Sequence, residues 1–231
     1  MKPLIETDQE FICDIQAPCF QMLSEEEAAL IRASKTQVMF RKGENLTKQG
    51  TFASYVLFIM SGLVKQYVEG DSTHNYNLQL VQPNEFLGLS AVFGEAIYPY
   101  SATALMETQV FLIEKEALSK VVQQNGMFAY TIIKRYCEQN TRFYSVVRNL
   151  IYKQMNGHMA DALLYLSSEN FAGLEVTALL TRKEIADFAG ISTESAVKIL
   201  KSFEKEGIIA LADKIVSIIH RDRLEEISKH G

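Results

Sequence analysis

A short polar segment in the last quarter of the chain carries the residues best suited to hydrogen bonding with a nucleic acid. Glu194 and Lys198 stand four residues apart, and Thr193 and Ser195 flank the glutamate. A carboxylate accepts from the amino group of cytosine, and an ammonium group donates to the acceptors of guanine. Hydroxyl groups bond to phosphates or base edges. This combination predicts a surface that contacts DNA.

Two short helices joined by a tight turn must position these residues. Thr181 and Glu184 form a capping-box pattern at the start of the first helix, and Gly190 suits a left-handed turn at its end. Ser192 can cap the second helix. The inner face of that helix carries Ala196, Ile199, Leu200 and Phe203. Such a pair is typical of a DNA-binding helix-turn-helix, with an ordinary helical hairpin in a core as the alternative.

Two further features favour DNA over the core hairpin. Lys198, Lys201 and Lys205 form a positive stripe along the second helix. Residues 208–219 follow as two short strands around an Ala-Asp-Lys turn, which is the pattern of the wing in a winged helix. The residues expected to contact DNA are Thr181, Arg182, Ser192, Thr193, Glu194, Ser195, Lys198 and Lys201.

Composition places limits on the kind of protein. The formal net charge of the 231 residues is −5, so DNA must be bound by a local patch and not by a generally basic surface. No run approaches the roughly 20 apolar residues of a membrane span, and acidic residues interrupt the N-terminal segment before a signal-peptide pattern develops. The three cysteines (Cys13, Cys19 and Cys137) have no repeating spacing. A reduced, cytoplasmic setting is expected.

The residue pattern changes twice in the part of the chain that precedes the two helices. After a helical lead-in that Ser24 can cap, residues 36–114 hold short runs of β-branched and aromatic residues separated by turn residues. Strands are expected near residues 37–41, 54–60, 63–69, 75–81, 101–106 and 109–114. The predicted fold class is α+β: an antiparallel β-roll (double-stranded β-helix or jelly-roll-like), a long dimerisation helix and a winged helix-turn-helix. The corresponding domains are residues 1–115, 116–153 and 154–231.

The long helix is expected from about Met127 to Tyr152. An a/d seam of a coiled coil runs through Ala129, Ile133, Tyr136, Asn140, Phe143, Val147 and Leu150. The alternative is one amphipathic helix packed on its own domain. A homodimer would present two reading helices to a palindrome with half-sites about 34 Å apart. A further helix over residues 155–169, with a joint at Asn156-Gly157, and then a loop and strand over residues 170–180 should lead into Thr181.

This order of elements resembles the Crp/Fnr family of bacterial transcription regulators. The resemblance runs from about Leu23 to Val216, and its most specific part is residues 180–209. A second part is the roll pattern with Gly43-Glu44, Gln49-Gly50, Gly62 and FLGLSAVF at residues 86–93. The resemblance implies a sequence-specific regulator that acts as a homodimer on palindromic DNA.

The resemblance also assigns roles to positions of the reading helix. The family's base-reading glutamate falls on Glu194, and its usual arginine one turn later is Lys198, which lacks the guanidinium fork. Thr193 stands where the cyclic AMP-binding member has another arginine. The expected site therefore keeps one G·C contact per half-site and differs at the outermost guanine.

The sensor departs from the members that bind cyclic AMP. Leu89 replaces their glutamate after the FxG turn, and Tyr100-Ser101 replaces their Arg-Ser pair. A buried phosphate without a cation is poorly compensated, so these residues argue against cyclic AMP. An effector pocket between roll and long helix is expected at Gly88, Leu89, Ser90, Tyr100, Ser101, Phe143 and Tyr144. The alternative is that these side chains fill the core of the roll, and the effector stays unknown.

The sequence gives little support for a metal cofactor or for catalysis. Three dispersed thiols match an iron–sulfur cluster poorly, and neither His74 nor His158 has a partner at a spacing that suggests haem. The roll resembles cupin barrels, but only His74 falls within it, and no GxSxG, Walker or HExxH pattern occurs. No enzyme is expected.

Partners other than DNA are less defined. Activation would need a surface for RNA polymerase, and residues 170–178 match the family's contact loop only loosely. The competing function is a ligand-binding dimeric module whose helix-turn-helix mediates protein contact. Salt-dependent DNA binding separates the two functions, because counterion release makes DNA affinity fall steeply with salt.

Overall fold

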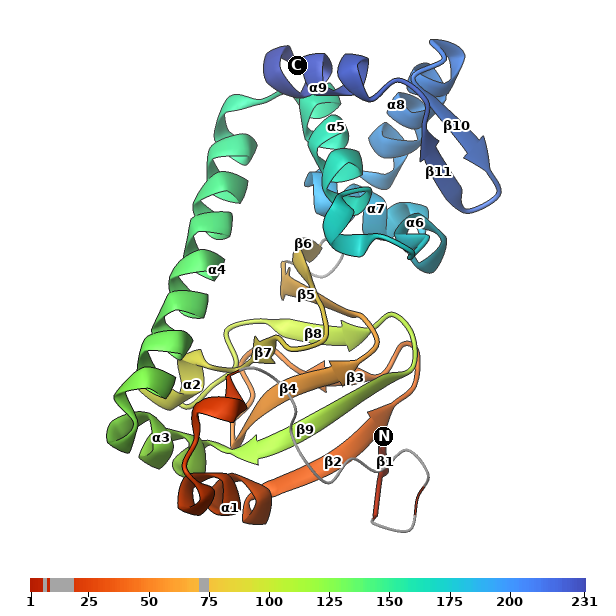
Figure 1. Cartoon of the computed structure of the whole chain (residues 1–231). Coiled ribbons are helices and arrows are strands. Elements are labelled where there is room, and N and C mark those ends of the chain that lie inside the picture. Colours follow the sequence, from red (N-terminus) through yellow and green to blue (C-terminus); the bar gives the residue numbers. More distant parts are fainter. Residues whose placement is uncertain (6–7, 9–18, 71–74) are drawn as a thin grey trace. The chain divides into compact units, whose positions relative to one another are not determined.

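The computed structural model describes residues 1–5, 8, 19–70 and 75–231 of the chain (Figure 1). The described residues form two compact units. The first comprises Met1–Glu69 and Gln79–Arg142, and the second comprises Gly70–Leu78 and Phe143–Gly231. Within the described part of the chain, no helix is long and apolar enough to cross a membrane.

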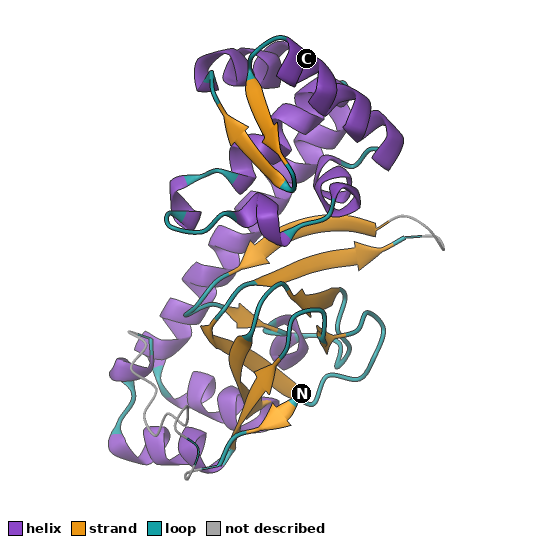
Figure 2. Ribbon diagram, turned by 90° about the vertical axis from the view of Figure 1, so that its right-hand side faces the viewer, coloured by secondary structure: helices purple, strands orange, loops and turns teal. Residues whose placement is uncertain are grey.

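The strand-rich part of the chain forms two antiparallel sheets, drawn in orange in Figure 2. The six expected strands are confirmed, and three very short ones at the sheet edges are added. The five-stranded sheet has the order β1 (Lys2–Pro3), β2 (Lys35–Phe40), β9 (Thr108–Glu114), β4 (Tyr55–Ser61) and β7 (Phe86–Leu87). The four-stranded sheet has the order β3 (Asn45–Thr47), β8 (Ser101–Ala104), β5 (Val64–Glu69) and β6 (Asn75–Val81).

Alternation along the strands builds two apolar clusters, because successive side chains point to opposite faces of a sheet. Leu57, Ile59 and Val110 join residues of the second sheet such as Val64 and Ala102 in one cluster. Their neighbours in sequence, chiefly Val56, Phe58, Phe111 and Ile113, join the second cluster together with helical residues. The five-stranded sheet is therefore buried on both faces.

Helices form the outer layer of the first unit. They are η1 (Phe20–Met22), α1 (Glu25–Ala33), α2 (Ser90–Phe93), α3 (Lys115–Gln124) and the first part of α4 (Gly126–Tyr152). Phe20 packs edge-on against Phe58 with ring centroids 5.1 Å apart, and Phe86 lies 4.8 Å from Phe58. The expected cap of the lead-in helix is confirmed, since Ser24 and Glu27 form a capping box.

The range assigned to the dimerisation helix, residues 116–153, also contains a separate helix, α3, that was not expected. Asn125 separates α3 from α4, because its Oδ1 accepts from the Phe128 N–H at 2.9 Å and its Nδ2 donates to Glu27 Oε2 at 2.8 Å. Leu118 and Val121 of α3 are buried in the helical cluster of the first unit. The long helix itself begins at Gly126 and ends at Tyr152, close to the expected bounds.

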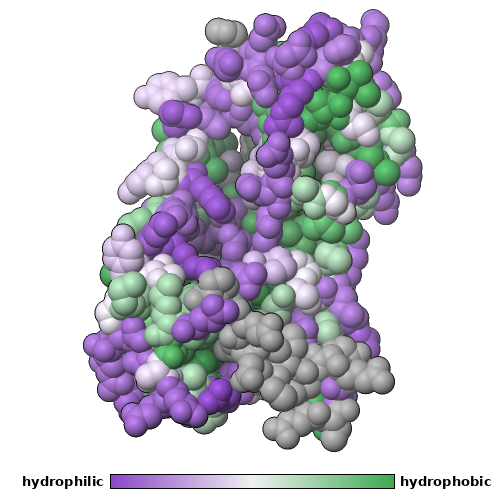
Figure 3. Space-filling view, viewed as in Figure 1, coloured by the Kyte–Doolittle hydropathy of each residue, from purple (hydrophilic) through white to green (hydrophobic). Residues whose placement is uncertain are grey.

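The second unit is a small helical domain with a hairpin. Its elements are α5 (Met155–Leu166), η2 (Glu169–Phe171), α6 (Val176–Leu179), α7 (Arg182–Ala189), α8 (Thr193–Lys205), β10 (Ile209–Ala212), β11 (Ile215–Ile218) and α9 (Arg221–His230). Hydrophilic side chains cover much of the face shown in Figure 3, and apolar ones gather over the β10–β11 hairpin. The expected winged helix-turn-helix architecture is confirmed.

Two local expectations in this unit were wrong. Asn156-Gly157 lies in the first turn of α5 and not at a joint, and the break between helices falls at Lys153-Gln154. A Cβ on Gly157 would lie 2.5 Å from the Gly231 carbonyl oxygen, so this glycine allows close packing. The strand expected before Thr181 is the short helix α6 instead, and its Val176 and Thr177 are buried.

Candidate functional site

Local capping chemistry fixes the two helices of the helix-turn-helix. The Thr181 hydroxyl accepts from the Glu184 N–H at 3.2 Å, and the Glu184 carboxylate accepts from the Thr181 N–H at 2.7 Å. Gly190 ends α7 in the left-handed conformation, with φ 63°, which costs glycine little. The Ser192 hydroxyl then accepts from the Ser195 N–H at 3.1 Å and starts α8. The capping predicted for this stretch is confirmed.

The outer face of α8 presents the predicted reading residues to solvent. Thr193, Glu194, Lys198 and Lys201 are exposed, while the opposite face of the helix is buried. Lys198 Nζ lies 2.7 Å from Glu194 Oε1, and the two side chains are 74% and 79% exposed. An exposed ion pair of this spacing contributes only about 0.3–0.5 kcal/mol. The ion pair can therefore be replaced by contacts of both side chains with base edges at little cost in free energy.

The other predicted contact residues hold the motif together. The hydroxyls of Ser192 and Ser195 are 2.9 Å apart and hydrogen-bonded. Arg182 Nη2 donates to the Asp213 carbonyl oxygen at 2.9 Å. Asp213 lies in the turn of the wing, where its φ of 52° is left-handed. Arg182 therefore ties the start of α7 to the wing, a role that its place beside Thr181 in the sequence does not reveal.

Three of the predicted effector residues of the roll, Gly88, Tyr100 and Ser101, are hydrogen-bonded within the chain. The Gly88 N–H donates to the Tyr100 hydroxyl at 2.7 Å. Ser101 accepts from the Gln49 N–H at 2.9 Å and donates to the Glu69 carboxylate. Burial raises the pKa of Tyr100 above its ordinary value, so its hydroxyl stays neutral. The groups that would face a cyclic phosphate thus already have partners.

A positive charge does reach this region, but a carboxylate neutralises it. Lys48 Nζ lies 2.6 Å from Glu69, and hydrogen bonds from Lys48 and Ser101 lower the pKa of the Glu69 carboxyl. Leu89 is 6% exposed, and the buried Ser90 hydroxyl has no hydrogen-bond partner among the described residues. The effector residues expected on the long helix are Phe143, which is half-buried, and Tyr144, which is 74% exposed.

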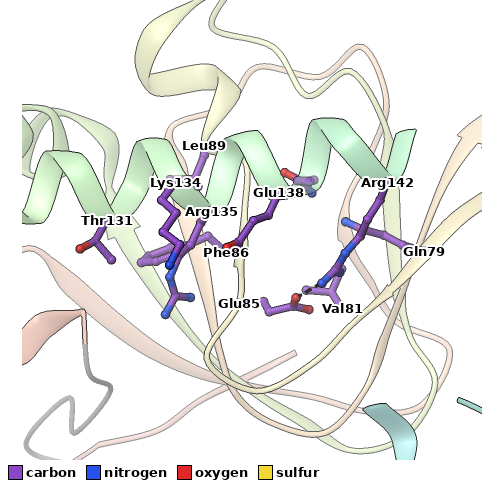
Figure 4. Close-up of a pocket in the computed structure, with 11 residues that line it drawn as sticks. Gln79, Val81, Glu85, Phe86, Leu89, Thr131, Lys134, Arg135, Glu138 and Arg142 are labelled. Atoms are coloured by element: carbon purple, nitrogen blue, oxygen red, sulfur yellow. Dashed lines mark ion pairs between the residues drawn. The ribbon is translucent and has the colours of Figure 1, made fainter. Parts of the chain in front are cut away.

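A cavity of about 340 Å³ lies elsewhere in the first unit, between α4 and the segment from β6 to β7. Of the predicted effector residues, only Leu89 lines it. Figure 4 shows that charged side chains of α4 project to one side of the helix, toward Glu85 and Phe86. The lining residues are Gln79, Val81, Glu85, Phe86, Leu89, Thr131, Lys134, Arg135, Glu138, Gln139 and Arg142.

Two arginines join α4 to the turn between β6 and β7. Arg135 Nη1 donates to the Asn84 carbonyl oxygen, and its guanidinium lies 5.9 Å from the centre of the Phe86 ring. Arg142 Nη1 lies 3.7 Å from Glu85 Oε1. Sequence reasoning missed these residues, because charged residues at helical spacing normally indicate a solvated face. The polar spacing of Arg135, Glu138 and Arg142, opposite an apolar stripe, was the available signal.

An exposed apolar stripe runs along another face of α4. The exposed side chains are Tyr130 (65%), Ile133 (57%), Tyr144 (74%), Val147 (53%) and Ile151 (65%). Cys137 and Asn140 complete a spacing of 3 and 4 residues along this stripe. Of the expected seam, Ile133, Asn140 and Val147 are shared with it. Tyr136 and Leu150 are 40% and 38% exposed, and Ala129 and Phe143 are half-buried.

The remaining sulfur and imidazole groups form no cofactor cluster among the residues described. Cys19 is buried, which raises the pKa of its thiol, whereas Cys137 is exposed. Both ring nitrogens of His158 are buried without a hydrogen-bond partner in the described part of the chain. No group of three or more His, Cys, Asp or Glu in that part is arranged to hold a metal ion. Cys13 and His74 lie outside the described residues.

Comparison with known proteins agrees with this architecture. Residues 37–125 match the cyclic nucleotide-binding domain, and residues 157–227 match the Crp-like helix-turn-helix domain. The Anaerobic regulatory protein of Bacillus subtilis is 24% identical over 205 residues, which cover 87% of this chain and 86% of the relative. The CRP-like cAMP-activated global transcriptional regulator of Mycobacterium tuberculosis is 25% identical over 213 residues, covering 90% and 95%.

A solved structure shows the same fold. A transcriptional regulator of the CRP/FNR family from Thermus thermophilus superposes with a TM-score of 0.66 at 22% identity, covering 84% of this chain and 98% of that chain. The two matched domains occur in the order expected from the sequence, and the relatives align along most of their length. The chain therefore belongs to the Crp/Fnr family of DNA-binding transcription regulators.

Proposed function

We propose that the chain is a sequence-specific regulator that binds palindromic DNA as a homodimer. The observation that carries this proposal is the exposed start of α8, where Glu194 and Lys198 lie opposite a buried face. The carboxylate accepts from a cytosine amino group, and the ammonium donates to the paired guanine. Thr193 and Lys201 add contacts to neighbouring groups. A single short helix reads few bases, so two copies are needed for a specific site.

The exposed stripe of α4 supports the homodimer. A contiguous row of large apolar side chains on a regulator's surface is a feature of interaction sites. Its spacing of 3 and 4 residues suits a two-stranded coiled coil, with Asn140 setting the register. We therefore assign dimerisation to the stripe, which keeps Ile133, Asn140 and Val147 of the expected seam. Tyr136, Phe143 and Leu150 flank it.

We assign sensing to residues 1–115, dimerisation to residues 116–153 and DNA binding to residues 154–231. Helix α3, although part of the second range, belongs to the packing of the roll. The protein acts in the cytoplasm, without an enzymatic activity of its own, and influences RNA polymerase from its DNA site. Its effector is not cyclic AMP, because internal bonds already use the Tyr100 and Ser101 groups that would meet the phosphate.

The test is a binding-site selection on the full-length protein and two variants. Wild type should return a palindrome with one G·C pair per half-site that depends on Glu194. Glu194→Ala should relax preference at that pair at a cost of roughly 1–3 kcal/mol, whereas Lys201→Gln should weaken all sequences alike and reduce the salt slope by about 1. An unchanged motif for Glu194→Ala would refute the reading assignment. DNA affinity independent of salt would favour a protein-contact module instead.

A further inference from the structure

The cavity beside α4 has more cationic than anionic side chains. Lys134, Arg135 and Arg142 line it together with Glu85 and Glu138. Glu85 is partly engaged, because its Oε2 accepts from the Gln82 N–H at 2.7 Å. Its separation of 3.7 Å from Arg142 makes a long ion pair. The cavity therefore offers cationic hydrogen-bond donors whose present partners are a backbone carbonyl and one loosely paired carboxylate.

A buried amide at the inner end supplies an independent sign of a ligand. Gln79 is 5% exposed and lines the cavity, and its Nε2 donates to Gln66 Oε1 at 2.8 Å. Its Oε1 is buried with no partner among the described residues. Exchanging oxygen and nitrogen in both amides preserves the bond between them and still leaves one polar atom of Gln79 unsatisfied. A buried polar group without a partner costs free energy that a bound molecule can recover.

The rest of the wall is apolar and aromatic. Phe86 is 6% exposed and Leu89 is 6% exposed, and Val81 is 1% exposed. The volume of about 340 Å³ lies at the small end of the range for ligand sites. A molecule that fits this wall needs an apolar or aromatic body together with its charged group.

We propose that this cavity binds a small organic anion. Its carboxylate or phosphate is held by Arg135 and Arg142, with Lys134 at the edge. Its body lies against Phe86 and Leu89, and a polar substituent bonds to Gln79. The site shares Leu89 with the effector pocket predicted from the sequence but does not include Gly88 or Ser101, where internal bonds already use the polar groups.

The same contacts give the anion a means of regulation. Arg135 and Arg142 join α4 to Asn84 and Glu85 of the turn between β6 and β7. An anion that takes either guanidinium must compete with that turn, so binding changes how α4 is held to the roll. This consequence for DNA affinity rests on the proposed function. Binding of the anion does not, and it is tested without DNA.

The experiment measures affinities of the full-length protein for matched small molecules by calorimetry and saturation-transfer NMR. The probes are benzoate and phenyl phosphate, with benzamide as the neutral counterpart of benzoate. Cyclic AMP tests the effector pocket predicted at Gly88 and Ser101. We expect the two anions to bind and benzamide to bind at least tenfold more weakly. Arg142→Gln should weaken anion binding roughly tenfold, since a hydrogen bond to a charged group is lost.

A variant of opposite sign distinguishes binding from loss of structure. Glu138→Gln removes a carboxylate that repels the anion, so its anion affinity should rise. Arg41→Gln replaces an exposed arginine of the roll outside the cavity and should leave affinity unchanged. The proposal would be overturned if neither anion bound, or if benzamide bound as tightly as benzoate. It would also be overturned if anion affinity were unchanged by the substitutions at Arg142 and Glu138. Tight binding of cyclic AMP that is lost in Ser101→Ala but kept in Arg142→Gln would overturn it as well.

Discussion

At the scale of single residues, the proposed reading groups of α8 are exposed, whereas Tyr100 and Ser101 of the roll are bonded internally. Glu194 and Lys198 pair with each other on the surface, where the pair is weak and easily replaced by DNA. Tyr100 and Ser101 instead bond to Gly88 and Glu69, inside the roll. Glu194 and Lys198 are therefore accessible to a binding partner, whereas Tyr100 and Ser101 already have hydrogen-bond partners within the chain.

Tyr98 gives the roll a predictable alkaline limit. Burial raises its pKa from 10.0 to about 12, against the opposing effect of its hydrogen bond to the Tyr55 carbonyl. The raised pKa favours the neutral hydroxyl in the folded state, so this contribution to stability is complete below pH 10 and is lost as pH rises toward 12. Between these two pH values the free energy of unfolding should fall less steeply for Tyr98→Phe than for wild type, by about 1.4 kcal/mol per pH unit.

Chemical denaturation at a series of pH values measures this effect. The variant will start less stable at neutral pH, because the Tyr55 carbonyl loses a donor that lies at 2.7 Å. The prediction concerns the slope above pH 10, which separates titration from the lost hydrogen bond. Parallel slopes for wild type and variant would show that the Tyr98 hydroxyl titrates at its ordinary pKa in the folded protein.

Residue patterns predicted the caps of the helix-turn-helix but only part of the hydrogen bonding in the roll. Capping at Thr181 and Ser192 depends on neighbours within four residues, so the sequence contains what is needed to predict it. The bond between Gly88 and Tyr100 spans 12 positions, and that between Ser101 and Glu69 spans 32. The sequence shows that the Arg-Ser pair is missing, but only the fold shows which groups replace its contacts.

At the scale of elements, α4 presents different side chains on two of its faces. Arg135 and Arg142 face the cavity of the roll, whereas Ile133, Val147 and Ile151 are exposed on a different side. Residues spaced three and four apart share one side of a helix, so the two sets do not mix. The proposed dimer interface and the proposed ligand site therefore lie on different faces of the helix.

The register of the proposed dimer is open to a direct chemical test. In a two-fold interface of parallel helices, a residue at a seam position lies opposite its own copy. Cys137 is exposed within the stripe, next to Ile133 and Asn140 along it. Mild oxidation of the native protein should therefore give a dimer joined through Cys137 of each chain, identified by mass spectrometry of the linked peptides.

Controls distinguish the two possible registers. Cys137→Ser should remove the cross-link and leave the mass in solution that of a dimer. Tyr144→Arg should disrupt the dimer, measured by analytical ultracentrifugation, and Tyr136→Arg should do so less. If Tyr136→Arg were the more disruptive change and Cys137 failed to cross-link, the original seam through Tyr136 and Phe143 would be the correct one.

Strong local patterns predicted most elements, and packing decided the others. The six main strands followed from β-branched runs between turn residues. Helix α3 was missed because Asn125 ends it through contacts with Glu27 and Phe128, and one of those partners is far away in sequence. Helix α6 was taken for a strand, since four residues with buried Val176 and Thr177 carry no helical period that could be read.

At the scale of the whole molecule, an acidic chain must bind an acidic polymer. The net charge of −5 means that long-range attraction to DNA is small. The positive surface of each α8 is limited to lysines at its outer face. In the proposed homodimer, specific binding depends on two copies acting together, so an effector that changed their alignment would have a large influence on affinity.

The proposed coupling between the cavity and DNA is measurable from either side. If binding of an anion changes affinity for the operator by some factor, the operator must change affinity for the anion by the same factor. We expect phenyl phosphate to shift operator affinity by roughly 5- to 150-fold, the usual range for coupled sites. Calorimetry of the anion against free and operator-bound protein should return the same ratio, and Arg142→Gln should reduce both.

The two proposals fail in different ways in this experiment. If an anion binds but operator affinity does not change, the cavity is a ligand site that does not control DNA binding. If no anion affects operator affinity and Glu194→Ala still relaxes the motif, the protein is a sequence-specific regulator whose effector binds at another site. Equal coupling in both directions, lost when Arg142 is neutralised, connects the guanidinium groups of α4 to the output at α8.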